Sequence, residues 1–122
     1  MKNIHEITID DPVILIRVAG LFREDMTPEE LYHATRSSWL VSPVNANKAQ
    51  YAFSINEGVV QEVYQIDGWN FAGMDDKNPD RKRYEFTGKI AENSVRNKYL
   101  YQSIKHYFKK GNRRSFMYLN VK

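Results

Sequence analysis

Two β-rich runs joined by a short turn constrain the fold of this chain more than any other feature. The runs AQYAFSI (49–55) and VVQEVYQI (59–66) are rich in Val, Ile, Tyr and Phe, which favour strands. Asn56-Glu57-Gly58 lies between them, and glycine adopts the left-handed backbone conformation of such turns without strain. The sequence therefore predicts a β-hairpin with a three-residue turn and a left-handed Gly58.

Three further strands are predicted on either side of the hairpin. They cover VILIRV (13–18), RYEFTGKIA (83–91) and SFMYLNV (115–121). Arg17 in the first of them should face water or an open edge, because an unpaired charge is costly to bury. Asp67-Gly68 is expected to end the second hairpin strand, and the polar segments 42–48 and 70–83 are expected to be loops.

The segment MTPEELYHATR predicts a helix with a defined start. Thr27 is a good N-cap, Pro28 suits the first helical position, and Glu30 completes a capping box. Leu31, Ala34 and Thr35 would then share the face that packs inward.

The segment ENSVRNKYLYQSIKHYFKKG (92–111) predicts a second helix. Its apolar residues recur at helical spacing, and Gly111 after two lysines is typical of a helix end. A break near 101–103 stays open, with Ser103 as the cap of a separate helix.

The predicted elements follow the order strand, helix, hairpin, strand, helix, strand. A chain of 122 residues suffices for one domain, spanning 1–122. This pattern predicts an α+β fold, with a small curved sheet or a partly closed β-barrel and two or three flanking helices.

Composition excludes several kinds of site. Cysteine is absent, which excludes disulfides, thiolate metal centres and a cysteine nucleophile. His5, His33 and His106 show no ligand spacing, so we expect no metal, and no nucleotide-cofactor motif is present. The apolar run 13–19 is interrupted by Arg17 and too short for a signal peptide or a membrane span, so we expect a cytoplasmic protein.

Charge is distributed unevenly along the chain. Residues 1–61 carry 5 Lys/Arg and 8 Asp/Glu (net −3), whereas residues 62–122 carry 13 and 7 (net +6). A basic half attracts polyanions, although it is also compatible with an ordinary solvated surface. Nucleic acid, RNA or DNA, is therefore the partner that the charge pattern favours.

The order of motifs resembles that of a group of small bacterial and phage proteins. The motifs are LYHATRSSW, KAQYAFSINEGVVQEVYQIDGW, RYEFTGKI and the terminal YLNV. We associate this layout with the PUA-like superfamily, which includes the ASCH and EVE domains. The resemblance implies a small β-barrel with flanking helices, of a kind that often binds RNA or modified bases in DNA. Ser37, Leu40 and Tyr84 depart from the usual pattern, so the ligand of such relatives does not transfer directly.

The segment after the first predicted helix suggests a base-binding site. The indole of Trp39 can stack on a base, and the hydroxyl of Ser38 can bond to a base edge. Trp69 and Asn70 follow the hairpin and offer the same two kinds of contact. Either tryptophan could instead be a core residue, and the sequence leaves both interpretations open.

Cationic side chains supply the candidate phosphate ligands, because Arg and Lys bind phosphate oxygens directly. The candidates are Arg36, Lys48, Arg81, Lys82, Arg83, Lys109, Lys110, Arg113 and Arg114. Interleaved aromatic residues suit a nucleic-acid track along the basic half.

Two other functions stay open at this stage. One is a protein-interaction module of phage or mobile-element origin that blocks a host enzyme, through the acidic half or the segment 70–83. The other is a small ASCH-like RNA nuclease or hydrolase, for which Lys48 and Glu62 are the candidates to carry chemistry. No motif supports a catalytic role, so we assign no catalytic residue and favour a protein that is not an enzyme. His33 fits an exposed helix position better than a general base.

Overall fold

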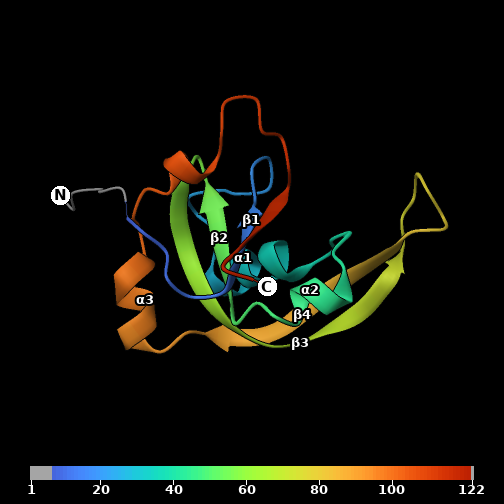
Figure 1. Ribbon diagram of the computed structural model, residues 1–122, viewed down its shortest axis with the longest axis horizontal. Coiled ribbons are helices and arrows are strands. Elements are labelled where there is room, and N and C mark those ends of the chain that lie inside the picture. The colour runs from blue at the N-terminus through green and yellow to red at the C-terminus, as the bar shows by residue number, and fades with distance from the viewer. Residues whose placement is uncertain (1–6, 122) are drawn as a thin grey trace.

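The computed structural model describes residues 7–121, which form a five-stranded mixed sheet flanked by helices (Figure 1). In this range the elements are β1 (Val13–Arg17), α1 (Pro28–Arg36), α2 (Pro43–Ala46), β2 (Tyr51–Asn56), β3 (Val59–Met74), β4 (Lys82–Ile90), α3 (Asn93–Tyr99), the 3₁₀-helix η1 (Lys105–Tyr107) and β5 (Phe116–Leu119).

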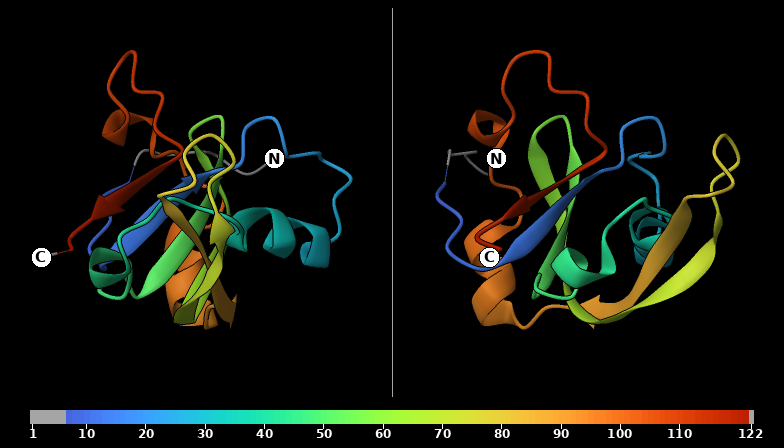
Figure 2. Two further views of the ribbon diagram at one scale, coloured as in Figure 1. Left: turned by 90° about the vertical axis from the view of Figure 1, so that its right-hand side faces the viewer. Right: turned by 45° about the vertical axis from the view of Figure 1, so that its right-hand side comes forward.

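The sheet has the strand order β4-β3-β2-β1-β5. β1 runs parallel to β2, and the other neighbouring pairs are antiparallel. β4 and β5 form opposite edges and do not pair, so the sheet is open and the predicted barrel closure is absent from the described residues. The predicted α+β class and curved sheet are confirmed (Figures 1 and 2), and the resemblance to PUA-like barrels stays a prediction.

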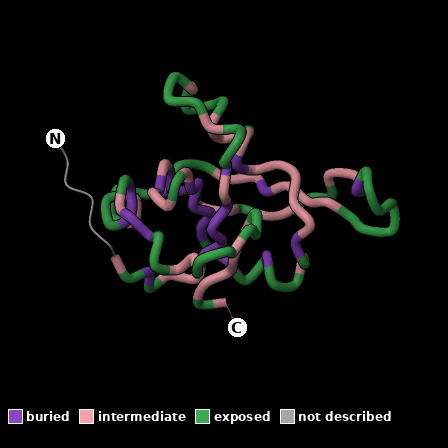
Figure 3. The backbone as a smooth tube through the Cα atoms, turned by 90° about the horizontal axis from the view of Figure 1, so that it is seen from above, coloured by how far each residue is buried: buried purple, intermediate pink, exposed green. Residues whose placement is uncertain are grey.

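Both faces of the sheet are packed, because side chains along β1 alternate between two cores. Val13 and Leu15 join the core that α3 covers with Tyr99. Ile14 and Ile16 join the core on the opposite face, where α1 packs. The buried residues therefore gather at the centre of the molecule (Figure 3).

α1 begins with the predicted capping box. The Glu30 backbone N–H donates to Thr27 Oγ1 at 3.1 Å, and the Thr27 backbone N–H donates to Glu30 Oε1 at 3.0 Å. The bonds from Thr27 and the nearby Arg23 lower the pKa of the Glu30 carboxyl. Of the predicted inward face, Thr35 is completely buried, and Leu31 is partly buried.

The hairpin forms where it was predicted, but with a shorter turn. Asn56 pairs with Val59 in the ladder, so only Glu57 and Gly58 make the turn. Both have positive φ, 52° and 75°, as two-residue hairpin turns of this hand require. Gly58 thus has the predicted left-handed conformation.

The prediction that Asp67-Gly68 ends the strand was wrong, as was part of the predicted 70–83 loop. β3 continues to Met74 and pairs with β4 from Lys82 onward, so only 75–81 is a loop. Register shifts at Ile66/Gly68 and Phe71/Gly73 accommodate the glycines within the ladder. The ends of the two strands extend beyond the body of the sheet as a curved arm, formed by 70–85 (Figure 2).

The predicted helix 92–111 was mostly wrong. α3 ends at Tyr99, and Tyr101 has a φ of 62°, so the chain leaves the helix near 101–103, which is the break that the sequence allows. Ser103 caps no helix, since Ile104 precedes η1 and has no capping side-chain bond. Segment 108–115, predicted to hold the helix end, is a protruding loop, shown in red at the top of Figure 1.

Smaller differences concern the ends of elements. β1 and β5 are shorter than predicted, and the 42–48 loop contains the one-turn helix α2. None of the helices in residues 7–121 is long and apolar enough to cross a membrane.

Candidate nucleic-acid interface

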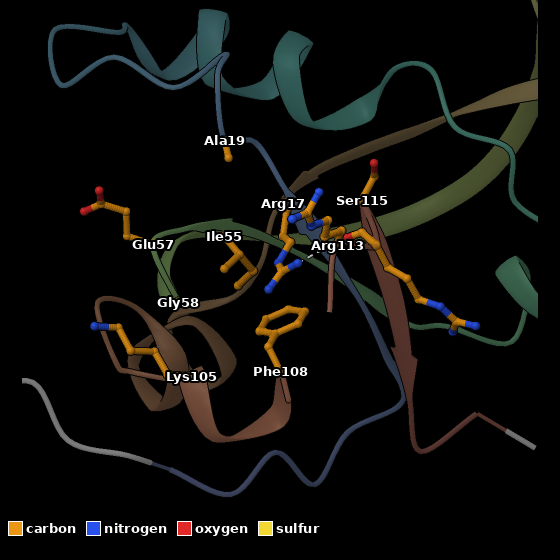
Figure 4. Close-up of a pocket in the computed structure, with 10 residues that line it drawn as sticks. Arg17, Ala19, Ile55, Glu57, Gly58, Lys105, Phe108, Arg113 and Ser115 are labelled. Carbon is orange, nitrogen blue, oxygen red and sulfur yellow. Dashed lines mark hydrogen bonds between the residues drawn. The ribbon is translucent and has the colours of Figure 1, made fainter. Parts of the chain in front are cut away.

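A basic pocket lies where the parallel strands β1 and β2 end (Figure 4). β5 starts at the same end of the sheet, because it runs antiparallel to β1. The pocket has a volume of about 570 Å³, which is in the range of small-ligand sites. It is lined by Arg17, Ala19, Ile55, Glu57, Gly58, Lys105, Phe108, Arg113, Arg114 and Ser115.

Arg17 fastens the segment 108–115 to the end of β1. Its Nη1 donates to the backbone oxygens of Asn112 at 2.7 Å and Arg114 at 3.2 Å. Its guanidinium carbon lies 3.9 Å from the centre of the Phe108 ring. Figure 4 shows the two side chains next to each other. Its Nε and Nη2 donate to no group in the described chain, so they are available to a ligand.

Lys105 is held at the rim by the hairpin turn. The backbone N–H of Ile104 donates to the Gly58 oxygen at 2.7 Å, which ties the start of η1 to the turn. The aliphatic stem of Lys105 lies directly on Gly58, where an added Cβ would collide with it. Glu57, next in the turn, lies on the same side of the pocket as Lys105 (Figure 4).

The pocket is strongly cationic. Four cationic side chains line it, from Arg17, Lys105, Arg113 and Arg114, against the single carboxylate of Glu57. Lys105 and both of the later arginines are exposed, as are Lys109 and Lys110 on the protruding segment 108–115. Like charges gathered around a concavity focus a positive potential that attracts anions.

Trp39 does not line this pocket. Its backbone bridges to Tyr84 on the outer edge of β4, through two hydrogen bonds of 2.8 Å. Its indole N–H donates to the Thr35 oxygen at 2.8 Å, and its ring packs against the α1 core. Ser38, joined to Ser37 by a cis peptide bond, lies beside it. The structure therefore favours a core role for Trp39 over base stacking.

Trp69 is also a packing residue. Its ring meets Phe86 edge to face, with centroids 5.5 Å apart, on the α1 side of the sheet. Its Nε1 is buried and bonds to no acceptor in the described chain, so it cannot reach a base edge. Asn70 is exposed on the arm, opposite Glu85 in the ladder. The predicted base site therefore has no support from these contacts.

Arg36 is paired within the protein. Its Nε donates to the Phe86 oxygen at 2.9 Å, and its Nη1 meets a Glu85 carboxylate oxygen at 3.1 Å. Its side chain is only 19% exposed. These contacts do not support the prediction that Arg36 binds phosphate, because its guanidinium bonds to β4 instead.

Arg83 is likewise committed to the protein. It donates to one Asp75 carboxylate oxygen at 2.7 and 2.9 Å and to the Ser38 oxygen at 2.8 Å. The two bonds from Arg83 lower the pKa of the Asp75 carboxyl, which is buried. Ser38 and Arg83 line another pocket, where the carboxylates of Asp75 and Asp76 offset the cations of Lys77 and Arg83.

The other predicted phosphate ligands lie on separate surfaces. Arg81 and Lys82 are exposed on the arm, where they share a second pocket with Asp80. Lys48 is exposed between α2 and β2. Of the nine predicted phosphate ligands, the structure brings only Arg113 and Arg114 into the basic pocket.

The two residues considered for a catalytic role, Glu62 and Lys48, are not positioned for catalysis. Glu62 is buried and forms a two-pronged ion pair with Arg96, with N–O distances of 2.7 and 3.1 Å, which raises the pKa of Arg96. Lys48 lines none of the three pockets described here. Residues 7–121 contain no cluster of three or more His, Asp or Glu side chains that could hold a metal; His5 lies outside this range.

Comparisons of the chain with protein families, with curated proteins and with solved structures found no match.

Arg17, Phe108 and Glu57 are among the pocket residues that sequence reasoning did not assign to a site. The sequence signal for Arg17 is an arginine inside an otherwise apolar strand, because such a charge needs a hydrogen-bonding partner when it is partly buried. What it faces depends on the pairing of β1 with β5, about a hundred residues later.

Proposed function

We propose that the protein binds nucleic acid, and that the basic pocket and the protruding segment 108–115 hold its phosphate backbone. The observation that carries this proposal is that cationic side chains from β1, η1 and the segment just before β5 line one concavity. Such a cluster repels itself in the free protein, and phosphates relieve that repulsion while releasing counterions. The resemblance to PUA-like proteins agrees with the proposal and is itself still a prediction.

The shape of the site favours an unpaired strand. A duplex presents a convex surface, whereas a single strand can place one nucleotide at a time into a concavity of about 570 Å³. Phe108 offers little free stacking surface, because Arg17 covers one face of its ring and the residue also packs against the core on the α3 side of the sheet. Affinity should therefore come chiefly from phosphate contacts.

The salt dependence of binding tests the proposal. Lys105, Arg113 and Arg114 are exposed and free to neutralise about three phosphates, which gives a slope of about −2 in log affinity against log salt. Affinity for a fluorescein-labelled single-stranded RNA should then fall about 20-fold between 50 and 200 mM salt, as measured by fluorescence anisotropy.

A matched pair of variants locates the contact. Arg113→Gln/Arg114→Gln should make the slope shallower by about 1.4, because it removes two phosphate contacts. Arg81→Gln/Lys82→Gln removes the same charge from the arm and should leave the slope close to that of the wild type. A flat salt response, or equal effects of the two variants, would overturn the assignment.

A second candidate function, contact with a protein, is favoured by the arm. Phe71 and Met74 are exposed apolar side chains, at 57% and 43%, on this projecting element. Sedimentation velocity at rising concentration tests self-association, the simplest form of such contact, and Phe71→Ser/Met74→Ser should abolish it. A wild type that stays monomeric at all concentrations removes this form from consideration.

A further inference from the structure

The single carboxylate of the basic pocket points to the base that the pocket accepts. Glu57 lines the pocket beside four cationic side chains, and it forms no ion pair within residues 7–121. A carboxylate in a phosphate-binding site weakens binding by repulsion unless the ligand brings hydrogen-bond donors to it. Its position on a tight turn keeps it at the rim, opposite Arg113 and Ser115 (Figure 4).

A carboxylate accepts hydrogen bonds at two oxygens and donates none. Guanine is the base whose Watson–Crick edge presents two adjacent donors, N1–H and the N2 amino group, which match a carboxylate in a two-pronged arrangement. Adenine, cytosine and uracil each place acceptors beside their donor, and these acceptors would face the carboxylate oxygens. That edge is accessible only in an unpaired nucleotide.

We propose that the basic pocket binds an unpaired guanine nucleotide, with its base edge on Glu57, its phosphate on Arg113 and Arg114 across the pocket, and Lys105 beside Glu57 on a neighbouring phosphate of a strand. This inference rests on the proposed function for the phosphate contacts and adds the identity of the base. The pocket volume of about 570 Å³ accommodates one nucleotide. The same chemistry occurs in a strand and in free GMP, so the experiment includes both.

The test compares short labelled RNAs of uridine that carry one central guanine, adenine, cytosine or uridine. The guanine RNA should bind about tenfold more tightly than the other three by fluorescence anisotropy, as expected for a good two-pronged base contact. GMP should compete with it more strongly than UMP. Glu57→Gln replaces one acceptor by a donor, so the preference should fall below about twofold, while affinity for the uridine RNA stays equal or rises.

Lys105→Gln is the matched control at the same rim, where it should weaken all four RNAs and preserve the guanine preference. Salt-dependent binding of all four RNAs with equal affinity overturns the guanine inference and leaves the proposed function standing. A guanine preference that survives Glu57→Gln also overturns it. Binding of GMP without binding of any RNA supports the inference for the pocket and refutes strand binding as its function.

Discussion

Arg17 is the residue on which the basic pocket depends for its shape, and its replacement tests that role. Arg17→Met keeps the aliphatic stem but removes the guanidinium that bonds to two backbone oxygens of the segment 108–115. It also removes the cation over Phe108. We expect this variant to lose stability and to loosen the segment at one end of the pocket.

The size of the loss follows from the contacts. The 2.7 Å bond from a charged donor at a partly exposed site contributes about 1 kcal/mol, and the 3.2 Å bond contributes less. The cation over the ring at 3.9 Å adds about 0.5–1 kcal/mol. The total is about 2 kcal/mol, which lowers the urea midpoint by about 1 M for a slope of about 2 kcal/mol per M.

Urea unfolding followed by circular dichroism measures the midpoint, and hydrogen exchange measures the opening of 108–115. Arg17→Lys keeps the positive charge but removes the planar guanidinium, and an ammonium stacks poorly on Phe108. This variant therefore distinguishes the effect of the charge from the effect of the guanidinium contacts. It should lose about half as much stability as Arg17→Met and retain most of the salt slope of RNA binding. A midpoint within about 0.2 M of the wild type for Arg17→Met, with unchanged exchange in 108–115, would refute this reasoning.

Three other contacts give measurable outcomes. Thr27→Ala removes the α1 cap and should cost about 1 kcal/mol in urea unfolding, whereas an unchanged midpoint contradicts the cap's role. Arg96→Leu leaves Glu62 buried without its partner and should lower the free energy of unfolding by about 3 kcal/mol. The double variant Glu62→Leu/Arg96→Leu should recover most of this loss, whereas additive losses from the two single changes argue against the pairing. Arg83 lowers the pKa of Asp75 below its ordinary 3.8, so this pair stabilises the fold above about pH 4 and is lost as the pH falls through the lowered pKa. A carboxyl NMR titration midpoint at or above 3.8 contradicts this.

The sequence predicted the elements whose signals are local. The α1 start depends on Thr27 and Glu30, three residues apart, and the hairpin depends on Gly58 between two β-rich runs. In both cases the responsible residues are close together in the chain, so the element can be predicted without knowledge of any distant contact.

The structures of the arm and of the segment 92–111 could not be predicted from such local signals. Gly68 and Gly73 resemble strand breakers, and only the pairing of β3 with β4 absorbs them at irregularities in the ladder. The apolar spacing in 92–111 is helical, yet the helix ends before Leu100 and the chain turns left-handed at Tyr101. Leu100 and Ile104 reach the interior from the irregular segment on either side of this turn. Tertiary packing overrode local propensity in both segments.

The candidate site was predicted only in part for the same reason. Arg113 and Arg114 were correctly singled out as cations, but their meeting with Arg17 depends on β5 lying beside β1. Tryptophan serves cores and ligand sites equally well, so the sequence could not separate the two roles for Trp39 and Trp69. Their contacts with α1 and β4 now favour the core.

The most direct test of where nucleic acid binds is an NMR titration of ¹⁵N-labelled protein with a short single-stranded RNA. We expect the largest shifts at the backbone amides of Gly58, Lys105 and Ser115, which surround the basic pocket. The two indole N–H signals, of Trp39 and Trp69, should stay in place, because one is bonded to Thr35 and the other is buried. Large shifts of the indole signals, with the amides around the basic pocket unchanged, would contradict the account.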